Sequence, residues 1–396
     1  MDDLSLILTV ADDWHPRNGS GSSAIERKVA LPPALTDSVA LVIQGVRRCG
    51  KSTLMRQLVA RYDLDPEHCV FINFEDPRLA DALHFSTLDA LVTAFRARHP
   101  RPARLAFFLD EIQSVTGWER WLRTQLDRRT GHRFIVSGSN AALLSGELGS
   151  VLTGRHLAIE LHPFDFDEFR LARPKPVRTA LDRFLELGGF PEPLTRDDGD
   201  NLLRQYFHDI VERDIRERLL ARSSRPLRQV LQMTFESAGS ELSLRRVAAA
   251  SGIAIETAGS YLEAAENAYL LFGVPFFAFS ERKRASHAKK YYPVDTGLRR
   301  VVTTTGGADR GKALECATFM TLRRHFRDIA YWRGEGEVDF VVRDGTRILP
   351  IQVTLDTLQP RHERALTSFY ESFPQAEEAI TVTLKTFPDL ASRLTA

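Results

Sequence analysis

The sequence predicts an α/β fold: a parallel sheet core, then a helical and winged-helix part, then a second α/β domain. Up to about residue 160, continuous apolar runs alternate with amphipathic segments, which is typical of βαβ units. Beyond that point amphipathic segments follow one another directly, which indicates helices. The 396 residues, of which 43% are hydrophobic and 27% charged, allow several domains of ordinary globular composition.

The bulk composition excludes several classes of protein. A formal net charge of +1 gives no whole-chain attraction to nucleic acid or membrane. The three cysteines, Cys49, Cys69 and Cys316, form no C-x-x-C pair, so we expect neither a disulfide framework nor a zinc site. The N-terminus lacks the basic start of a signal peptide, and no apolar stretch could span a bilayer. We therefore expect a cytoplasmic protein with no membrane partner.

The first region predicts four strands with helices between them. Each predicted strand is a continuous apolar run, as expected in a sheet covered on both faces. We expect strands at 38–44, 68–75, 105–111 and 133–139, helices at 51–62, 88–98 and 118–129, and a flexible surface segment at 15–25.

A phosphate-binding loop connects the first predicted strand to the first helix. The segment GVRRCGKST matches G-x-x-x-x-G-K-[ST] in the strand–loop–helix context that this motif requires, so we expect a P-loop NTPase core. Backbone N–H groups and the helix N-terminus favour phosphates there. Lys51 is expected at the β- and γ-phosphates of ATP and Ser52 at Mg²⁺. The expected ATP-binding residues are Gly45, Val46, Arg47, Arg48, Cys49, Gly50, Lys51, Ser52 and Thr53.

Two carboxylates end the third predicted strand. Asp110 is expected to bind Mg²⁺, directly or through water, and Glu111 to act as the general base on the attacking water. Ser139 or Asn140, after the next strand, could sense the γ-phosphate, although a turn or helix cap is an equally good interpretation. Arg155 could act as an arginine finger, against the ordinary alternative of a surface ion pair.

These motifs resemble the AAA-related ATPases of bacteria and archaea, in which a C-terminal domain of uncharacterised function follows the ATPase domain. The first part of the resemblance rests on the phosphate loop, Leu105–Gln113 with Trp118, Ser137–Asn140, and Leu152–Arg155. It continues through GGFPE (188–192), YFHDIVERDI (206–215), KKYYPVDTGL (289–298), GKALE (311–315), YWRGEGEVDF (331–340) and LPIQV (349–353). The resemblance implies an AAA-like, oligomer-prone ATPase core, with Arg155 acting on a neighbouring copy.

Residues 243–277 predict a winged helix-turn-helix, with Gly252 in the turn and 257–267 as the recognition helix. That helix carries two glutamates and no lysine or arginine, which argues against DNA at its surface. The basic patch 282–290 could hold DNA phosphates without reading sequence, or it could be a solvated loop. The patch contains Arg282, Lys283, Arg284, Lys289 and Lys290.

Beyond a linker at 303–311, the predicted order of elements resembles PD-(D/E)XK-type nuclease cores. The candidate Mg²⁺ ligands are Glu315 on a helix, Asp339 on a strand and Gln352 on the next strand. Gln352 stands where these enzymes keep a carboxylate, and Thr354 where they keep a lysine. We therefore expect a degenerate nuclease site that binds nucleic acid or protein, with an active nuclease as the alternative.

The chain is thus expected to contain four parts. They are a P-loop ATPase domain at 1–162, a helical lid at 163–222, a winged-helix module at 223–302 and a PD-(D/E)XK-like domain at 303–396. The predicted function is Mg²⁺-dependent ATP hydrolysis coupled to a nucleic-acid or protein client. An ATP-dependent DNA-processing nuclease and an ATP-bound switch that does not turn over are the alternatives.

Overall fold

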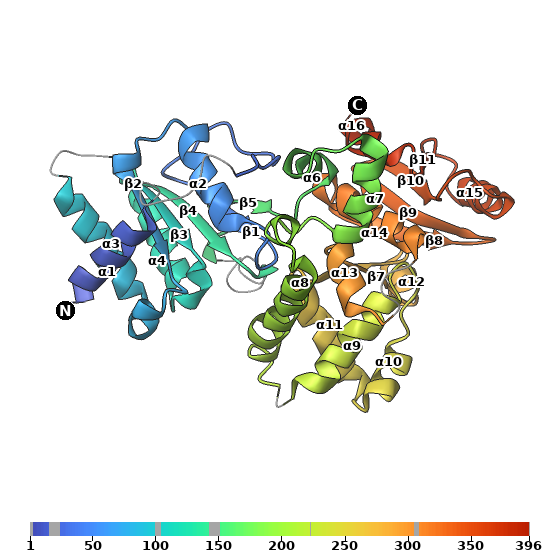
Figure 1. Cartoon of the computed structure of the whole chain (residues 1–396), viewed down its shortest axis with the longest axis horizontal. Helices are drawn as coiled ribbons and strands as arrows, with labels where there is room; N and C mark the ends of the chain where they lie inside the picture. Colours follow the sequence, from blue (N-terminus) through green and yellow to red (C-terminus); the bar gives the residue numbers. More distant parts are fainter. Residues whose placement is uncertain are drawn as a thin grey trace. The chain divides into compact units, whose positions relative to one another are not determined.

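The computed structural model describes residues 3–15, 24–99, 104–141, 151–221, 223–304 and 309–395. The chain divides into two compact units, Met1–Leu161 and His162–Ala396 (Figure 1). Most of the expected flexible segment and the middle of the 303–311 linker lie outside the described residues. The finer division into four parts stays a prediction.

A five-stranded parallel sheet in the order β2-β3-β4-β1-β5 forms the centre of the first unit. The strands are β1 (Ala40–Gln44), β2 (Cys69–Asn73), β3 (Ala106–Asp110), β4 (Arg133–Gly138) and β5 (His156–Glu160). The first four confirm the predicted strands and the parallel sheet. The edge strand β5 was not predicted, because its sequence has no continuous apolar run and Leu157 is 50% exposed.

The described helices beside this sheet are α1 (Asp3–Trp14), α2 (Lys51–Arg61), α3 (Phe85–Arg98) and α4 (Trp118–Arg128). Short 3₁₀ turns lie at Pro66–His68, Pro77–Ala82 and Ile112–Ser114. The helix α1 was not predicted, although its apolar run was noted. It lies beside α3 and β2, and it buries Ile7, Val10 and Ala11 in the core (Figure 1).

The second unit begins with helices. These are α6 (Phe166–Ala172), α7 (Val177–Leu187), a 3₁₀ turn (Pro193–Thr195), α8 (Gly199–Asp209), a π-helical segment (Ile210–Arg216) and α9 (Ser224–Glu236). Next come α10 (Leu244–Ser251), α11 (Ile255–Asn267), β6 (Leu271–Val274), α12 (Glu281–Ala285), β7 (Lys290–Pro293) and α13 (Thr296–Val302). The antiparallel pair β6–β7 and the turn at Gly252 confirm the predicted elements of this part.

A four-stranded sheet in the order β11-β10-β9-β8 completes the second unit. The elements are α14 (Arg310–His325), β8 (Asp328–Arg333), β9 (Glu337–Asp344), β10 (Arg347–Val353), α15 (Pro360–Ser372), β11 (Ile380–Val382), a 3₁₀ turn (Phe387–Asp389) and α16 (Leu390–Thr395). The first three strands are antiparallel, and β11 returns parallel to β10 after α15. This order confirms the elements expected from the sequence, namely a helix at 312–326, strands at 329–334, 337–344 and 347–354, a helix at 361–373 and a strand at 379–384. Their relation to nuclease cores stays a prediction.

A buried aspartate connects two distant segments of the second unit, GGFPE and YYPVDTGL. Asp295 is 5% exposed and caps α13, with Oδ1 accepting a hydrogen bond from the Leu298 N–H at 2.7 Å. Its Oδ2 accepts from the N–H of Gly189 at 2.6 Å. A Cβ at Gly297 would lie 2.0 Å from the carbonyl oxygen of Leu187, so only glycine fits this crossing. Burial raises the pKa of Asp295 to about 6.

We expect Asp295→Ala to lower the free energy of unfolding by about 3 kcal/mol, because two buried N–H groups lose their acceptor. Urea denaturation followed by circular dichroism measures the change. Asp198→Ala is the matched control, since Asp198 also precedes a helix but is exposed and caps no N–H with its side chain. Equal stability losses in the two variants would contradict the role given to Asp295.

Candidate functional site

Three predicted site segments meet at one edge of the first unit's sheet. The loop Gly45–Gly50 follows β1, and Asp110 is the last residue of β3, with Glu111 next. Ser137 is the last residue but one of β4. Because β1, β4 and β3 are adjacent and parallel, their carboxyl ends lie side by side. Ligands of open parallel sheets bind at this edge.

The phosphate loop is anchored by contacts that only a glycine-containing loop allows. A Cβ at Gly45 would lie 2.0 Å from the carbonyl oxygen of Leu161, and Gly50 has a φ of 102°. The fully buried Cys49 directs its Sγ to the Leu161 carbonyl at 3.3 Å. From the other side, the buried Arg27 donates to the Cys49 carbonyl at 2.7 Å. The loop is therefore held curled at the start of α2.

Lys51 and Glu111 form a buried ion pair beneath this loop. The side chains are 4% and 10% exposed, and Nζ lies 3.3 Å from Oε1. The ammonium also donates to the carbonyls of Gly45 (3.2 Å) and Val46 (3.4 Å). Burial alone would raise the pKa of Glu111, but the Lys51 charge, the Gln113 hydrogen bond and the Arg47 charge together outweigh it and lower that pKa. Burial likewise opposes the charged form of Lys51, yet the acidic groups around it, Glu111 first, together raise its pKa above the ordinary value. Both groups are charged at neutral pH.

Asp110 lies between two serine hydroxyls. Ser52 Oγ donates to its Oδ2 at 2.5 Å, and Ser137 Oγ donates to its Oδ1. The same Ser137 oxygen accepts from the N–H of Glu111 at 3.2 Å. Burial first, and then the Glu111 charge, raises the pKa of Asp110. A hydroxyl and a carboxylate in contact are oxygen ligands of the kind that Mg²⁺ prefers, so Ser52 and Asp110 fit this ion.

Sequence reasoning missed Ser137 as a contact of the site. A serine at a fully buried position of an otherwise apolar strand was the available signal. The predicted sensor Asn140 is 5% exposed, and its backbone carbonyl accepts from Gln44 Nε2 at 3.5 Å. Arg47 leaves the loop to form a bidentate pair with Glu75, at 2.7 and 2.9 Å. Asn140 therefore lies at the site's edge of the sheet, and its sensing role stays a prediction.

Arg155 lies at the other edge of the same sheet. It directly precedes β5, where its carbonyl accepts from the N–H of Ala40 at 2.9 Å, and β1 and β5 are parallel. Its guanidinium pairs with Asp127 at 2.7 Å, which is the surface ion pair considered as the alternative. Within one chain Arg155 is thus a strand length away from the phosphate loop. Its role as a finger toward another copy stays a prediction.

In the second unit, the three candidate nuclease residues come together. They line a cavity of about 1030 Å³. Asp339 Oδ2 accepts from Gln352 Nε2 at 2.5 Å and from the Val353 N–H at 2.7 Å, while Glu315 Oε1 accepts from Tyr292 at 2.6 Å. Burial raises the pKa of both carboxyls, and the Glu315 charge adds to the rise at Asp339. The buried Gln352 Oε1 has no hydrogen-bond partner among the described residues.

The inclusion of Lys290 in an exposed basic patch was wrong. Its side chain is fully buried, pairs with Glu337, and lies 5.1 Å from the centre of the Tyr331 ring. Its charge lowers the pKa of both Glu315 and Asp339. The sequence was interpreted as a solvated charge run, but strand β7 carries this lysine into the acidic cluster. Lys290 therefore places a positive charge at the Glu315–Asp339 cluster, which the residue at position 354, a threonine, does not provide.

The rest of the predicted DNA-binding part is partly engaged within the unit. Arg284 contacts Glu281 at 3.1 Å and Asp328 at 3.9 Å. On the predicted recognition helix, Glu266 Oε1 accepts from the N–H of Gly273 at 2.8 Å, so this carboxylate caps β6. Arg282 and Lys283 are exposed. DNA contact through this part stays a prediction.

Among the described residues, no group of three or more histidine, cysteine, aspartate or glutamate side chains is arranged to hold a metal ion. In the same part of the chain, no helix combines the length and apolarity needed to cross a membrane.

Three protein-family models match the chain in succession. Residues 37–170 match an AAA domain, residues 178–309 a domain of unknown function (DUF8612), and residues 310–390 another domain of unknown function (DUF4143). The phosphate loop, Asp110, Glu111 and Ser137 all fall within the first match. The match supports a nucleotide-binding P-loop domain of the AAA type in the first unit.

Two similar proteins bear the name uncharacterized protein. One from Haemophilus influenzae is 29% identical over 342 residues, covering 81% of this chain and 84% of that protein. One from Methanocaldococcus jannaschii is 28% identical over 353 residues, covering 83% and 77%. Among solved structures, Cdc6p from Pyrobaculum aerophilum is 12% identical with a TM-score of 0.28, covering 68% of this chain and 86% of that one. PCH-2 of C. elegans is 11% identical with a TM-score of 0.27, covering 67% of each chain. We draw nothing from these two structural likenesses, because both TM-scores are low.

We expect Ser137→Ala to weaken Mg²⁺-dependent binding of ATP by about tenfold, because Asp110 loses the hydroxyl that orients it. The measurement is a Mg²⁺ titration of binding of a fluorescent ATP analogue. Thr87→Ala is the matched control, since Thr87 is also buried in the first unit but donates its hydroxyl to the Ala82 carbonyl, at 2.6 Å. An equal or larger effect at Thr87 would refute the role given to Ser137.

Proposed function

We propose that the chain is a Mg²⁺-dependent ATPase. The first unit binds and hydrolyses ATP, and the second unit carries the response to a nucleic-acid or protein client. The observation that supports this most strongly is the convergence of Lys51, Ser52, Asp110 and Glu111 at the start of α2. Each has the chemistry that phosphoryl transfer to water requires: a phosphate cation, two magnesium ligands and a base.

ATP binding has to break the Lys51–Glu111 pair. The Lys51 ammonium is satisfied by Glu111 and by two carbonyls of the loop, so it can meet a phosphate only by leaving some of these partners. Phosphate oxygens replace them, together with backbone N–H groups and the helix N-terminus. Ser52 and Asp110 would hold Mg²⁺, which when bound neutralises phosphate charge.

The same exchange prepares Glu111 to accept a proton. While Lys51 is beside it, the carboxylate is a weak base, because the ammonium lowers its pKa. Once the ammonium moves to the phosphates, burial dominates and the pKa of Glu111 rises toward the range of an effective general base. Gln113 Nε2 donates to its Oε2 at 2.6 Å and holds the carboxylate in place. Base strength is therefore linked to nucleotide binding.

Phosphate release by the purified chain tests this proposal. We expect Lys51→Ala to lose both ATP binding and turnover, because the loop loses its phosphate cation and the buried Glu111 carboxylate loses its counter-charge. Glu111→Gln should keep ATP binding and lose turnover by about 100-fold. Glu75→Gln is the matched control, since it removes a carboxylate that contacts the loop through Arg47 only. Parental turnover in Glu111→Gln would reject Glu111 as the base.

The switch alternative makes a different forecast for the same experiment. A chain that binds ATP tightly but releases no phosphate, with Glu111→Gln indistinguishable from the parent, would be an ATP-bound adaptor. Added DNA separates the two kinds of client. It would raise turnover if the client is a nucleic acid, and it would leave turnover unchanged if the client is a protein.

We propose metal-dependent phosphodiester cleavage in the second unit as the second candidate function. The unpartnered Gln352 Oε1 beside two carboxylates, with Lys290 close by, favours it. Glu315, Asp339 and Gln352 would hold a divalent cation through oxygen, and Lys290 can stabilise the negative charge on the substrate. Cleavage of labelled DNA with Mn²⁺ tests the activity.

We expect Gln352→Glu to bind Mn²⁺ about tenfold more tightly than the parent, because a third carboxylate joins Glu315 and Asp339. Calorimetric titration with Mn²⁺ alone measures this. Gln359→Glu is the matched control, since Gln359 lines the same cavity without contacting either acid. Equal affinities in parent and Gln352→Glu would show that the cluster holds no metal.

A further inference from the structure

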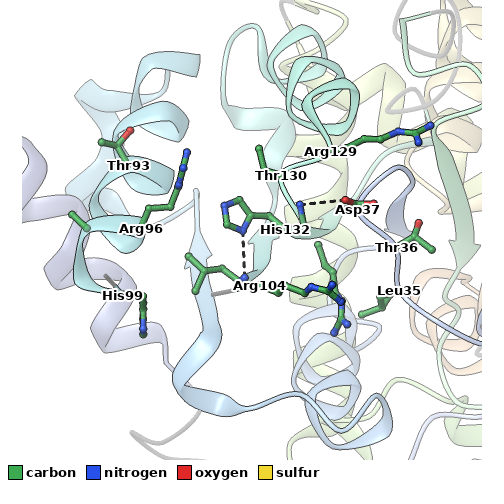
Figure 2. Close-up of a pocket in the computed structure, with 14 residues that line it drawn as sticks. Leu35, Thr36, Asp37, Thr93, Arg96, His99, Arg104, Arg129, Thr130 and His132 are labelled. Carbon is green, nitrogen blue, oxygen red and sulfur yellow. Dashed lines mark hydrogen bonds between the residues drawn. The ribbon is translucent and has the colours of Figure 1, made fainter. Parts of the chain in front are cut away.

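A large cavity of the first unit lies at the amino ends of its strands. It measures about 1130 Å³ and is lined by the segment before β1, the last turn of α3, and the connections into β3 and β4 (Figure 2). Its charged and titratable lining includes Arg96, Arg104, Arg129, Arg133, His132 and Asp37. Parallel strands place it at the edge opposite the phosphate loop. Five residues of strand separate the two sites by about 16 Å, so one ligand cannot be shared by both.

His132 lines this cavity and carries a buried ring nitrogen that no described residue contacts through a hydrogen bond. The residue is 4% exposed, and its Nδ1 accepts from the N–H of Leu105 at 3.3 Å (Figure 2). Burial, and then the charge of Arg96, lowers the pKa of His132, so the ring is neutral and its proton lies on Nε2. Among the described residues, Nε2 has no hydrogen-bond partner. Buried donors are nearly always paired, so Nε2 requires an acceptor that the described residues do not supply.

The charge of the cavity is positive. Within the described ranges, none of the four arginines lies within ion-pair distance of a carboxylate, and Asp37 is engaged by the N–H of Gly131 at 3.2 Å. The carbonyl ends of α3 and α4 also point here, each worth roughly half a negative charge. After Asp37 and the two helix ends are counted, the four arginines leave a surplus of roughly two positive charges. Arg96 and Arg129 can be accounted for as charges that complement the helix ends. Arg104 and Arg133 cannot, because they lie outside helices.

We propose that this cavity binds a phosphate-bearing anion, held by the arginine guanidinium groups and by Nε2 of His132. Guanidinium groups bind phosphate oxygens through paired hydrogen bonds, and a neutral imidazole N–H donates a further one. The phosphate comes from a free polyphosphate or from a nucleic-acid backbone. This site is separate from the ATP site, and it does not depend on ATP hydrolysis.

The test measures binding of inorganic pyrophosphate to the full chain by calorimetry. The Lys51→Ala background removes the phosphate loop as a competing site. In that background we expect Arg96→Gln with Arg104→Gln to weaken binding by about tenfold or more, because two charge-assisted contacts are lost. The matched control is Arg98→Gln with Arg120→Gln, which removes the same charge from α3 and α4 outside the cavity. We expect it to change binding by about twofold at most, since salt screens distant charges.

Three results would overturn the proposal. They are no pyrophosphate binding in the Lys51→Ala background, an equal loss in the control pair, and undiminished binding by a folded His132→Phe chain, whose folding is checked by its thermal melt. Competition with a single-stranded oligonucleotide identifies the source of the phosphate. Displacement of pyrophosphate by the oligonucleotide supports a backbone ligand, and pyrophosphate binding without displacement supports a free polyphosphate.

Discussion

The buried pair of Lys51 and Glu111 is the interaction on which the arrangement of the nucleotide site depends. Either charge alone would be costly to bury in this interior. Each group therefore requires its partner, or a ligand that carries the partner's charge, to stay in place. The pair joins the start of α2 to the end of β3 and brings Ser52 against Asp110. Glu111 adopts a φ of 53° at that point, a conformation that non-glycine residues rarely keep without such support. The Lys51–Glu111 pair therefore both holds the loop in place and keeps the Lys51 ammonium at the position where phosphate would bind.

The parts of the first unit with a local signal could be predicted from the sequence. Continuous apolar runs marked β1 to β4, and the glycine–lysine motif marked the phosphate loop. Parallel pairing then placed Asp110 and Glu111 beside that loop. The parts that depend on the third dimension could not be predicted. Ser137 contacts Asp110 because β3 and β4 pair in a particular register, and Arg27 reaches the loop from a segment with no motif.

In the second unit too, the elements could be predicted from the sequence, but the burial of particular charged side chains could not. Spacing along the chain predicted its helices and strands, but it did not show which side chains turn inward. Lys290 ends a run of basic residues and still lies buried against Glu337, because β7 pairs with β6 beneath the last sheet's acidic cluster. His132 in the first unit is a comparable case: only its burial and its unpartnered nitrogen mark it, and neither can be read from sequence.

The position of Leu161 has a consequence for communication along the chain. This last residue of the first unit donates its N–H to the Gln44 carbonyl at 2.6 Å, and its own carbonyl meets Cys49 of the phosphate loop. The backbone enters the second unit at the next residue. The phosphate loop therefore contacts the residue that immediately precedes the covalent junction between the units, so the backbone itself joins the nucleotide site to the start of the second unit.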